Sequence, residues 1–232
     1  MTGSRARTRG LETWVAGIAI ALRAATALAD TSAELNLCRD YNTPSARRLE
    51  ACGMVIADPM DAHAQFLGYA NRAQAYFMAA RGDKAMPDIS KAISLEPDNA
   101  VGYLIRGRFN YSYFQYDDAI ADLSVALKKL PDNLDALNHR ASSFGNVGKH
   151  ELAIADYDAI IRLKPEDASA YYARAFEHEA RRDFVRARSD FERSFELDSS
   201  LAGDFPASCF DVELFEKRRK LVNWPQCERD TR

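Results

Sequence analysis

The sequence lacks the short motifs by which common enzyme classes are recognised. It contains no G-x-S-x-G nucleophile turn, no P-loop and no G-x-G-x-x-G fingerprint. His150 and His178 each begin an H-E-x-x-H pattern, but Ile154 and Arg182 stand where the second zinc ligand would be. The four histidines are scattered, and we interpret them as surface or seam side chains. We therefore expect no enzymatic activity, no cofactor and no metal.

An excess of positive charge is also missing. The formal net charge is -3, whereas binding of nucleic acid would need a strongly basic surface. The chain is 47% hydrophobic and 28% charged, which is ordinary for a folded protein and unlike a disordered one. We expect a folded protein that does not bind nucleic acid.

The N-terminus carries an apolar run that is short for a membrane span. Arg5, Arg7 and Arg9 precede an apolar stretch from Trp14 to Leu22, and a small-x-small pattern ends at Ala29. This order predicts a secretory signal peptide, residues 1–29, and a periplasmic or secreted mature protein. Glu12 and Arg23 flank the run and leave two alternatives, an uncleaved membrane anchor and an exposed helix.

The strongest pattern is a repeat with a period of 34 residues. The stretch from Asp117 to Pro131 returns as the stretch from Glu151 to Pro165. Four repeats can be marked out, with residues 66–99, 100–133, 134–167 and 168–201. Their eighth residue is always small and their twentieth is always alanine: Ala73, Gly107, Ala141 and Ala175, then Ala85, Ala119, Ala153 and Ala187. A fixed period of this length is typical of a repeat array.

Each repeat is expected to form two antiparallel helices. The small residues at facing positions let two helix axes approach closely, while large apolar residues at the fourth, twenty-fourth and twenty-eighth positions fill the seams. Pro97, Pro131 and Pro165 follow the second helices and cannot continue them. The sequence therefore predicts an all-α superhelix, a solenoid of helix pairs.

This pattern resembles the tetratricopeptide repeat family, in its secreted bacterial type, over residues 66–199. The departures from it are local. Asn110 and His178 replace an aromatic residue that the family carries late in the first helix, and Ala80 and Arg182 replace a glycine at the turn between helices. Ser199 replaces the last proline, so the fourth repeat is the most degenerate.

Both ends of the array carry irregular segments. Residues 30–65 predict an N-terminal cap of two short helices, divided at Asn42-Thr43-Pro44. Residues 202–232 predict a C-terminal cap, with one helix from Asp211 to about Trp224 that covers the end of the fourth repeat. The basic run from Lys217 to Lys220 is interpreted as the solvated side of that helix rather than an anion site.

The four cysteines form one pair at each end of the mature chain. Neither pair has the C-x-x-C spacing of a zinc or thioredoxin-like site. Three pairings are possible, and we favour Cys38–Cys52 with Cys209–Cys227, because each closes a local loop beside a cap. Four buried free thiols are the alternative. Disulfides would require an oxidising compartment.

The resemblance implies a function in protein–protein interaction. In the family, the first helices of the repeats line a concave face that holds a peptide or a partner helix. The corresponding partner-binding residues in this sequence are Gln74, Phe77, Leu104, Arg108, Tyr111, Asn138, Tyr172 and Phe176. The clamp that some members use for a C-terminal carboxylate is absent, because Ala70 and Leu104 occupy its positions. We expect an apolar segment to dock near Phe77, Leu104 and Tyr111, unless these side chains fill contacts between neighbouring repeats.

We therefore predict a non-enzymatic scaffold that binds a peptide or helix of an unidentified partner protein. The main alternative is a membrane-tethered assembly factor that recruits an envelope enzyme, with the N-terminal segment uncleaved. A third is an enzyme with an unrecognised site, which would need a deep polar pocket with two or more histidines and carboxylates. The sequence leaves the oligomeric state open.

Overall fold

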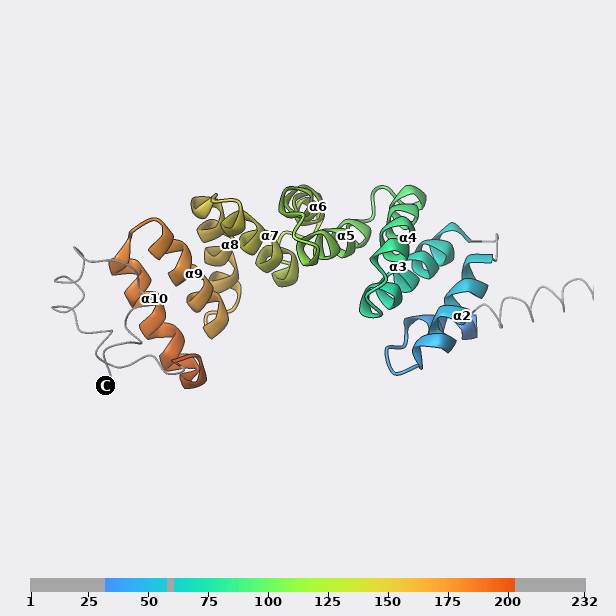
Figure 1. The fold of residues 1–232 in the computed structure, drawn as a ribbon, viewed down its shortest axis with the longest axis horizontal. Coiled ribbons are helices and arrows are strands. Elements are labelled where there is room, and N and C mark those ends of the chain that lie inside the picture. The colour runs from blue at the N-terminus through green and yellow to red at the C-terminus, as the bar shows by residue number, and fades with distance from the viewer. Residues whose placement is uncertain (1–31, 58–60, 203–232) are drawn as a thin grey trace, which may run out of the picture. The chain divides into compact units, whose positions relative to one another are not determined.

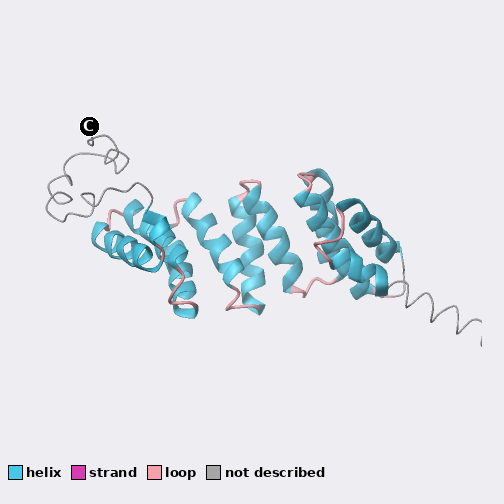
Figure 2. Cartoon of the chain, turned by 90° about the horizontal axis from the view of Figure 1, so that it is seen from below, coloured by secondary structure: helices cyan, strands magenta, loops and turns pink. Residues whose placement is uncertain are grey.

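The computed structural model describes residues 32–57 and 61–202, and within these ranges every regular element is helical (Figure 2). The predicted all-α architecture of packed helix pairs is thus confirmed. The expected signal peptide, the C-terminal helix from Asp211 and the pair Cys209–Cys227 lie outside the described residues.

The chain divides into two compact units, Met1–Phe109 and Asn110–Arg232, each described here by itself. In the N-terminal unit, residues 32–39 are helical and are followed by α2 (Ser45–Ala57), α3 (Ala62–Met78), α4 (Gly82–Leu95) and the first part of α5 (Ala100–Ser112). The C-terminal unit holds the end of α5 and then α6 (Tyr116–Lys129), α7 (Leu134–Asn146), α8 (His150–Leu163), α9 (Ala168–Ala180), α10 (Phe184–Leu197) and the short 3₁₀ helix η1 (Ser199–Ala202). Successive helices pack against one another within each unit (Figure 1).

A disulfide joins the helix at residues 32–39 to α2. Cys38 and Cys52 are both fully buried and are bonded with their Cα atoms 4.8 Å apart. Arg48 lies beside the bond and donates from Nε to the carbonyl oxygen of Cys38 at 3.0 Å. The bond therefore fixes the first helical hairpin of the chain.

Small residues bring the helices of the N-terminal unit together. Ala73 of α3 and Ala85 of α4 are fully buried in one core that also contains Phe66 and Phe109. At Gly102 of α5, an added Cβ would come within 2.8 Å of the Ile93 side chain. The alternation of small and large residues thus sets the close spacing of the helices.

The C-terminal unit uses the same device. Ala119, Ala141, Ala153 and Ala175 are fully buried where consecutive helices meet. Asn133 and Asp167 cap α7 and α9, because their side chains accept from the backbone N–H groups of residues 136 and 170.

The turn inside each helix pair has one residue in the left-handed region. These residues are Ala80, Phe114, Gly148 and Arg182, with φ between 55° and 74°. At each turn, the N–H group of the following residue donates to the carbonyl oxygen five residues earlier, as in a Schellman motif. The bond from Lys149 to Phe144, at 2.8 Å, is an example. Only one of the four turns has glycine, the residue that takes this conformation without steric cost.

We expect Arg182→Gly to raise the free energy of unfolding by about 1 kcal/mol, since it relieves the left-handed strain of a residue with a Cβ. The matched reverse change is Gly148→Ala. No atom lies within 4 Å of a Cβ built at Gly148, so only backbone strain would act there. We expect Gly148→Ala to lower stability by a similar amount in urea denaturation. Two changes of the same sign would contradict this interpretation.

Candidate partner-binding face

In three of the helix pairs, an arginine on the first helix forms an ion pair with an aspartate on the second helix. Arg72, Arg140 and Arg174 each grip an aspartate sixteen residues later with Nε and Nη2, at 2.6–2.8 Å: Asp88, Asp156 and Asp190. Their aspartate side chains are 8–11% exposed. Such two-pronged bonds fix the mutual orientation of the helices that carry them. We call this arrangement the Arg–Asp clamp.

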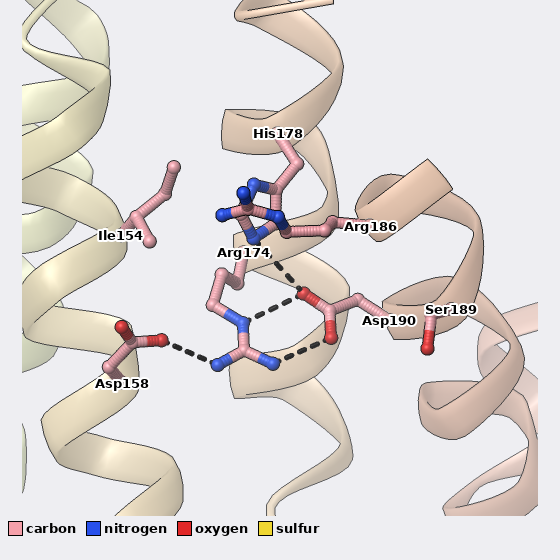
Figure 3. Close-up of a pocket in the computed structure, with 7 residues that line it drawn as sticks. All are labelled: Ile154, Asp158, Arg174, His178, Arg186, Ser189 and Asp190. Atoms are coloured by element: carbon pink, nitrogen blue, oxygen red, sulfur yellow. Dashed lines mark hydrogen bonds and ion pairs between the residues drawn. The ribbon is translucent and has the colours of Figure 1, made fainter. Parts of the chain in front are cut away.

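In the C-terminal unit, the clamp also reaches the preceding helix pair. Nη1 of Arg140 donates to the Ser124 hydroxyl of α6 at 3.2 Å, and Nη1 of Arg174 donates to Asp158 of α8 (Figure 3). The hydrogen bond to Asp190 is the main cause that raises the pKa of Arg174 above its usual value. Each guanidinium therefore links three helices.

A pocket of about 280 Å³ opens beside the last clamp, between α8, α9 and α10 (Figure 3). It is lined by Ile154, Asp158, Arg174, His178, Arg186, Ser189 and Asp190. Most of its charges are already paired, since Arg174 holds both aspartates and Arg186 pairs with Asp183 at 3.0 Å. We interpret the pocket as part of the packing between helix pairs rather than as a catalytic site.

The Arg–Asp clamp is not among the features predicted above, although its signal is visible in the sequence. Arginine recurs at the seventh position of all four repeats and aspartate at the twenty-third: Arg72, Arg106, Arg140 and Arg174, then Asp88, Asp122, Asp156 and Asp190. In the second repeat, Asp122 accepts from Nδ2 of Asn110 at 3.0 Å. A search for charged as well as apolar positions in phase would have found the series.

His178 is the buried histidine at the edge of this pocket. The residue is 4% exposed, its Nε2 lies 3.8 Å from Asp190, and its Nδ1 is buried without a hydrogen-bond partner. Burial lowers its pKa below the usual 6.5. Burial therefore favours the neutral form of this ring, and the missing hydrogen bond at Nδ1 lowers the stability of the fold.

We expect His178→Phe to make the protein more stable by about 1 kcal/mol at neutral pH, because the unpartnered nitrogen is removed. Since the folded pKa is lowered, the unfolded chain takes up the proton first, and wild-type stability should fall as the pH drops below 6.5. The variant should lack this part of the fall in urea denaturation at pH 7.5 and 5.5. His63→Gln, at an exposed site, is the control. An unchanged pH profile in His178→Phe would contradict the assignment.

The predicted partner-binding residues of the N-terminal unit differ in burial and in the contacts that they make. Phe77 stacks on Phe109 with ring centroids 4.3 Å apart, so it packs α3 against α5. Gln74 accepts from the Tyr41 hydroxyl at 2.6 Å. Leu104 is partly buried and Arg108 is exposed. Alanine at Phe77 would thus disturb helix packing as well as any binding.

The predicted residues of the C-terminal unit include the more accessible ones. Tyr111 is partly buried against His139, with ring centroids 5.1 Å apart. Asn138 is exposed on α7. On α9, Tyr172 and Phe176 contact each other edge to face at 5.0 Å, and Phe176 is 40% exposed.

Tyr172 and Phe176 lie on the side of α9 opposite the clamp. Arg174 is two residues from both Tyr172 and Phe176, and two residues correspond to about 200° around a helix. The clamp side of α9 therefore binds its neighbours through charge. The aromatic side packs on Phe191 of α10, with ring centroids 5.6 Å from Tyr172 and 5.1 Å from Phe176, and still leaves Phe176 40% exposed. We call the side of α7 and α9 that carries Asn138, Tyr172 and Phe176 the first-helix face.

The described part of the chain offers neither a cluster of metal ligands nor a membrane-spanning helix. Within residues 32–57 and 61–202, no group of three or more His, Cys, Asp or Glu side chains could hold a metal ion. None of the helices in these ranges is both long and apolar enough to cross a membrane.

Comparisons with known proteins identify one of the repeats. Residues 134–167 match the family model of the tetratricopeptide repeat, the same residues as the third repeat marked out above. No curated protein matches the sequence significantly. Among solved structures, the fold is similar to that of MamA MSR-1, with a TM-score of 0.65 and 18% identity over 76% of this chain and 99% of that one.

Two further MamA crystal structures are similar at the same level. One has a TM-score of 0.64 and 21% identity, covering 75% of this chain and 95% of its own. The other has a TM-score of 0.60 and 22% identity, covering 68% and 91%. At these identities the likeness establishes a shared fold.

Proposed function

Because this chain is built of helix pairs of the tetratricopeptide repeat type, we propose that it is a non-enzymatic scaffold that binds a peptide or helix of a partner protein. The proposed binding site is the first-helix face of the C-terminal unit. Arrays of helix pairs serve chiefly as binding surfaces, since each pair contacts only its neighbours and the remaining faces stay open. The fold alone does not name the partner.

The observation that carries this proposal is the exposed Phe176 beside Tyr172. A large aromatic ring that is 40% exposed, with a second ring at 5.0 Å, offers the kind of anchor that dominates binding energy at interfaces. Asn138 and Asn146 are exposed on α7 and can hydrogen-bond a partner's backbone or side chains. The occupant is therefore a segment with apolar side chains for α9 and polar groups for α7.

We infer that the protein works in an oxidising compartment, the periplasm or the exterior of the cell. The buried disulfide between Cys38 and Cys52 is compatible with such a compartment and uncommon in a reducing one. Its partner would then be another exported protein or an exported segment of a membrane protein.

Phe176→Ser is expected to reduce partner capture about tenfold, corresponding to the loss of one interface anchor. Capture would be measured with purified tagged protein and solubilised cell envelope, followed by quantitative mass spectrometry of the bound proteins. Val185→Ser is the matched control, because Val185 is 80% exposed and lies at the start of α10.

A partner retained by both wild type and Val185→Ser but lost with Phe176→Ser supports the face. Equal capture by all three proteins would overturn the site. Circular dichroism of the variants checks that helicity is unchanged.

A further inference from the structure

The pocket beside the last clamp contains a buried nitrogen atom whose hydrogen-bonding capacity is unused. Nδ1 of His178 has no hydrogen-bond partner within residues 32–57 and 61–202, although the residue is only 4% exposed. Nε2 is the ring nitrogen that faces Asp190, at 3.8 Å, so Nδ1 is the one left for another group (Figure 3). A buried polar atom without a partner lowers stability and is uncommon in folded proteins. A ligand in the pocket would supply the missing bond.

Arg186 of α10 brings a second group with free bonding capacity to the same pocket. Its Nε pairs with Asp183 at 3.0 Å, and in the described part of the chain no residue accepts a hydrogen bond from its terminal nitrogens. The side chain is 67% exposed, so the guanidinium can turn toward a ligand. Burial is the main cause that lowers the pKa of His178, and the charge of Arg186 adds to it, which shows that the two groups are near each other. Together they form a place for an anionic group.

The other residues that line the pocket limit the charge and the polarity of its ligand. Two arginines and two aspartates line it, and their formal charges cancel. A ligand with two negative charges would be repelled by Asp158 and Asp190, whereas a single negative charge can pair with Arg186. Ile154 of α8 supplies an apolar wall (Figure 3). A volume of about 280 Å³ suits a small molecule with one charged end and a short apolar part.

We propose that this pocket binds a small organic monocarboxylate, with its carboxylate between Arg186 and His178 and its apolar chain against Ile154. A guanidinium can donate two parallel hydrogen bonds to a carboxylate, which is a strong and directional contact. The pocket lies on the clamp side of α9, opposite the first-helix face. The proposal therefore stands apart from the proposed function in partner binding.

Binding of the carboxylate takes up a proton at His178. Because Nε2 faces a carboxylate, the neutral ring carries its proton there, and Nδ1 can donate to the ligand only when the ring is protonated. The charged groups that face the ring or line the same pocket are Asp190, Asp183, Arg174, Arg186 and Asp158. A bound carboxylate adds a negative charge to this set and so raises the pKa of His178. The affinity should therefore be several-fold higher at pH 5.5 than at pH 7.5.

Titration of the full chain with butyrate, followed by the NMR signal of the His178 ring, tests the site. The signal is identified by its absence in His178→Phe. We expect a saturable shift of this signal in the wild type and tighter binding at the lower pH. Arg186→Gln should weaken the affinity about tenfold, because a charge-assisted contact is lost.

Arg193→Gln is the matched control for Arg186→Gln. Arg193 lies on the same helix and pairs with Glu196 three residues away, as Arg186 pairs with Asp183, but it does not line the pocket. Its replacement should leave the affinity for butyrate unchanged. An equal loss in both variants would show a general charge effect and overturn the site.

The choice of probe decides which chemistry the pocket selects. We expect inorganic phosphate and butylammonium to bind at least about tenfold more weakly than butyrate, because the first carries more negative charge and the second carries the opposite charge. Equal binding of either probe would overturn the assignment to a monocarboxylate. Binding of N-acetylglutamic acid α-amide without binding of butyrate would make a partner's acidic side chain the occupant and overturn the small ligand.

Two further results would contradict the proposal. One is the absence of any saturable shift of the His178 signal. The other is an affinity that is equal at both pH values, which would exclude His178 from the site. Neither result depends on whether the chain captures a partner protein, so failure of the proposed function would leave this test intact.

Discussion

Replacement of both Cys38 and Cys52 by alanine is expected to lower the free energy of unfolding of the N-terminal unit by about 2–4 kcal/mol. The bond closes a loop with a sequence separation of 14 residues and ties the helix at residues 32–39 to α2. Short helices gain little stability from their own hydrogen bonds and depend on such constraints. Guanidinium denaturation should show the loss, and hydrogen exchange should place it in residues 32–57.

The matched control replaces Cys209 and Cys227 by alanine, which should leave hydrogen exchange of residues 32–57 unchanged. Because both sulfurs of the Cys38–Cys52 pair are buried, mild reductant should act on the wild type only after the hairpin opens. Equal stability of wild type and the Cys38→Ala/Cys52→Ala variant would show that packing alone holds the first hairpin.

Asp190→Ala should destabilise the C-terminal unit by about 3–5 kcal/mol, because it leaves the guanidinium of Arg174 buried without its main partner. The Arg174 side chain is 18% exposed and that of Asp190 is 8% exposed. The remaining bond to Asp158, whose side chain is 54% exposed, cannot compensate for the lost two-pronged contact. Urea denaturation followed by circular dichroism measures the change.

A double replacement distinguishes the net contribution of the ion pair to stability from the destabilisation caused by one buried charge without its partner. Arg174→Met with Asp190→Leu should stay within about 1 kcal/mol of the wild type, since a buried ion pair and well-packed apolar residues are often of similar stability. Asp158→Ala should cost less than Asp190→Ala. If the double variant is as unstable as Asp190→Ala, the contribution of the clamp is larger than pairing alone explains.

The helices could be predicted from the sequence because the pattern that specifies them is local and repeated. Alanine at positions such as Ala119 and Ala153 marks where two helices touch, and the proline after the second helix of the first three repeats marks its end. The all-α fold of helix pairs needs little more information than this.

The contacts of individual side chains could not be predicted in the same way. The position of Phe77 in its repeat predicts either a binding residue or a contact between neighbouring repeats, and its ring stacks on Phe109, a partner 32 residues away. Periodicity gives the side of the helix on which a residue lies but not what the neighbouring helix places against it. The clamp escapes prediction for a different reason, because its signal is a repeat of charged residues rather than of apolar and small ones.

The bond from Nη1 of a clamp arginine to the preceding helix pair affects how such a chain can lengthen or shorten by gene duplication and deletion. Nη1 of Arg140 donates to a serine on the preceding pair and Nη1 of Arg174 donates to an aspartate at the same place, so this nitrogen can donate to either kind of acceptor. Excision of residues 134–167 would join Asn133 to Ala168 and bring Arg174 to the position over Ser124 that Arg140 now holds. Splices in multiples of one period are therefore chemically compatible at the new junction, whereas any other length would move the guanidinium at the junction away from its acceptor on the preceding pair.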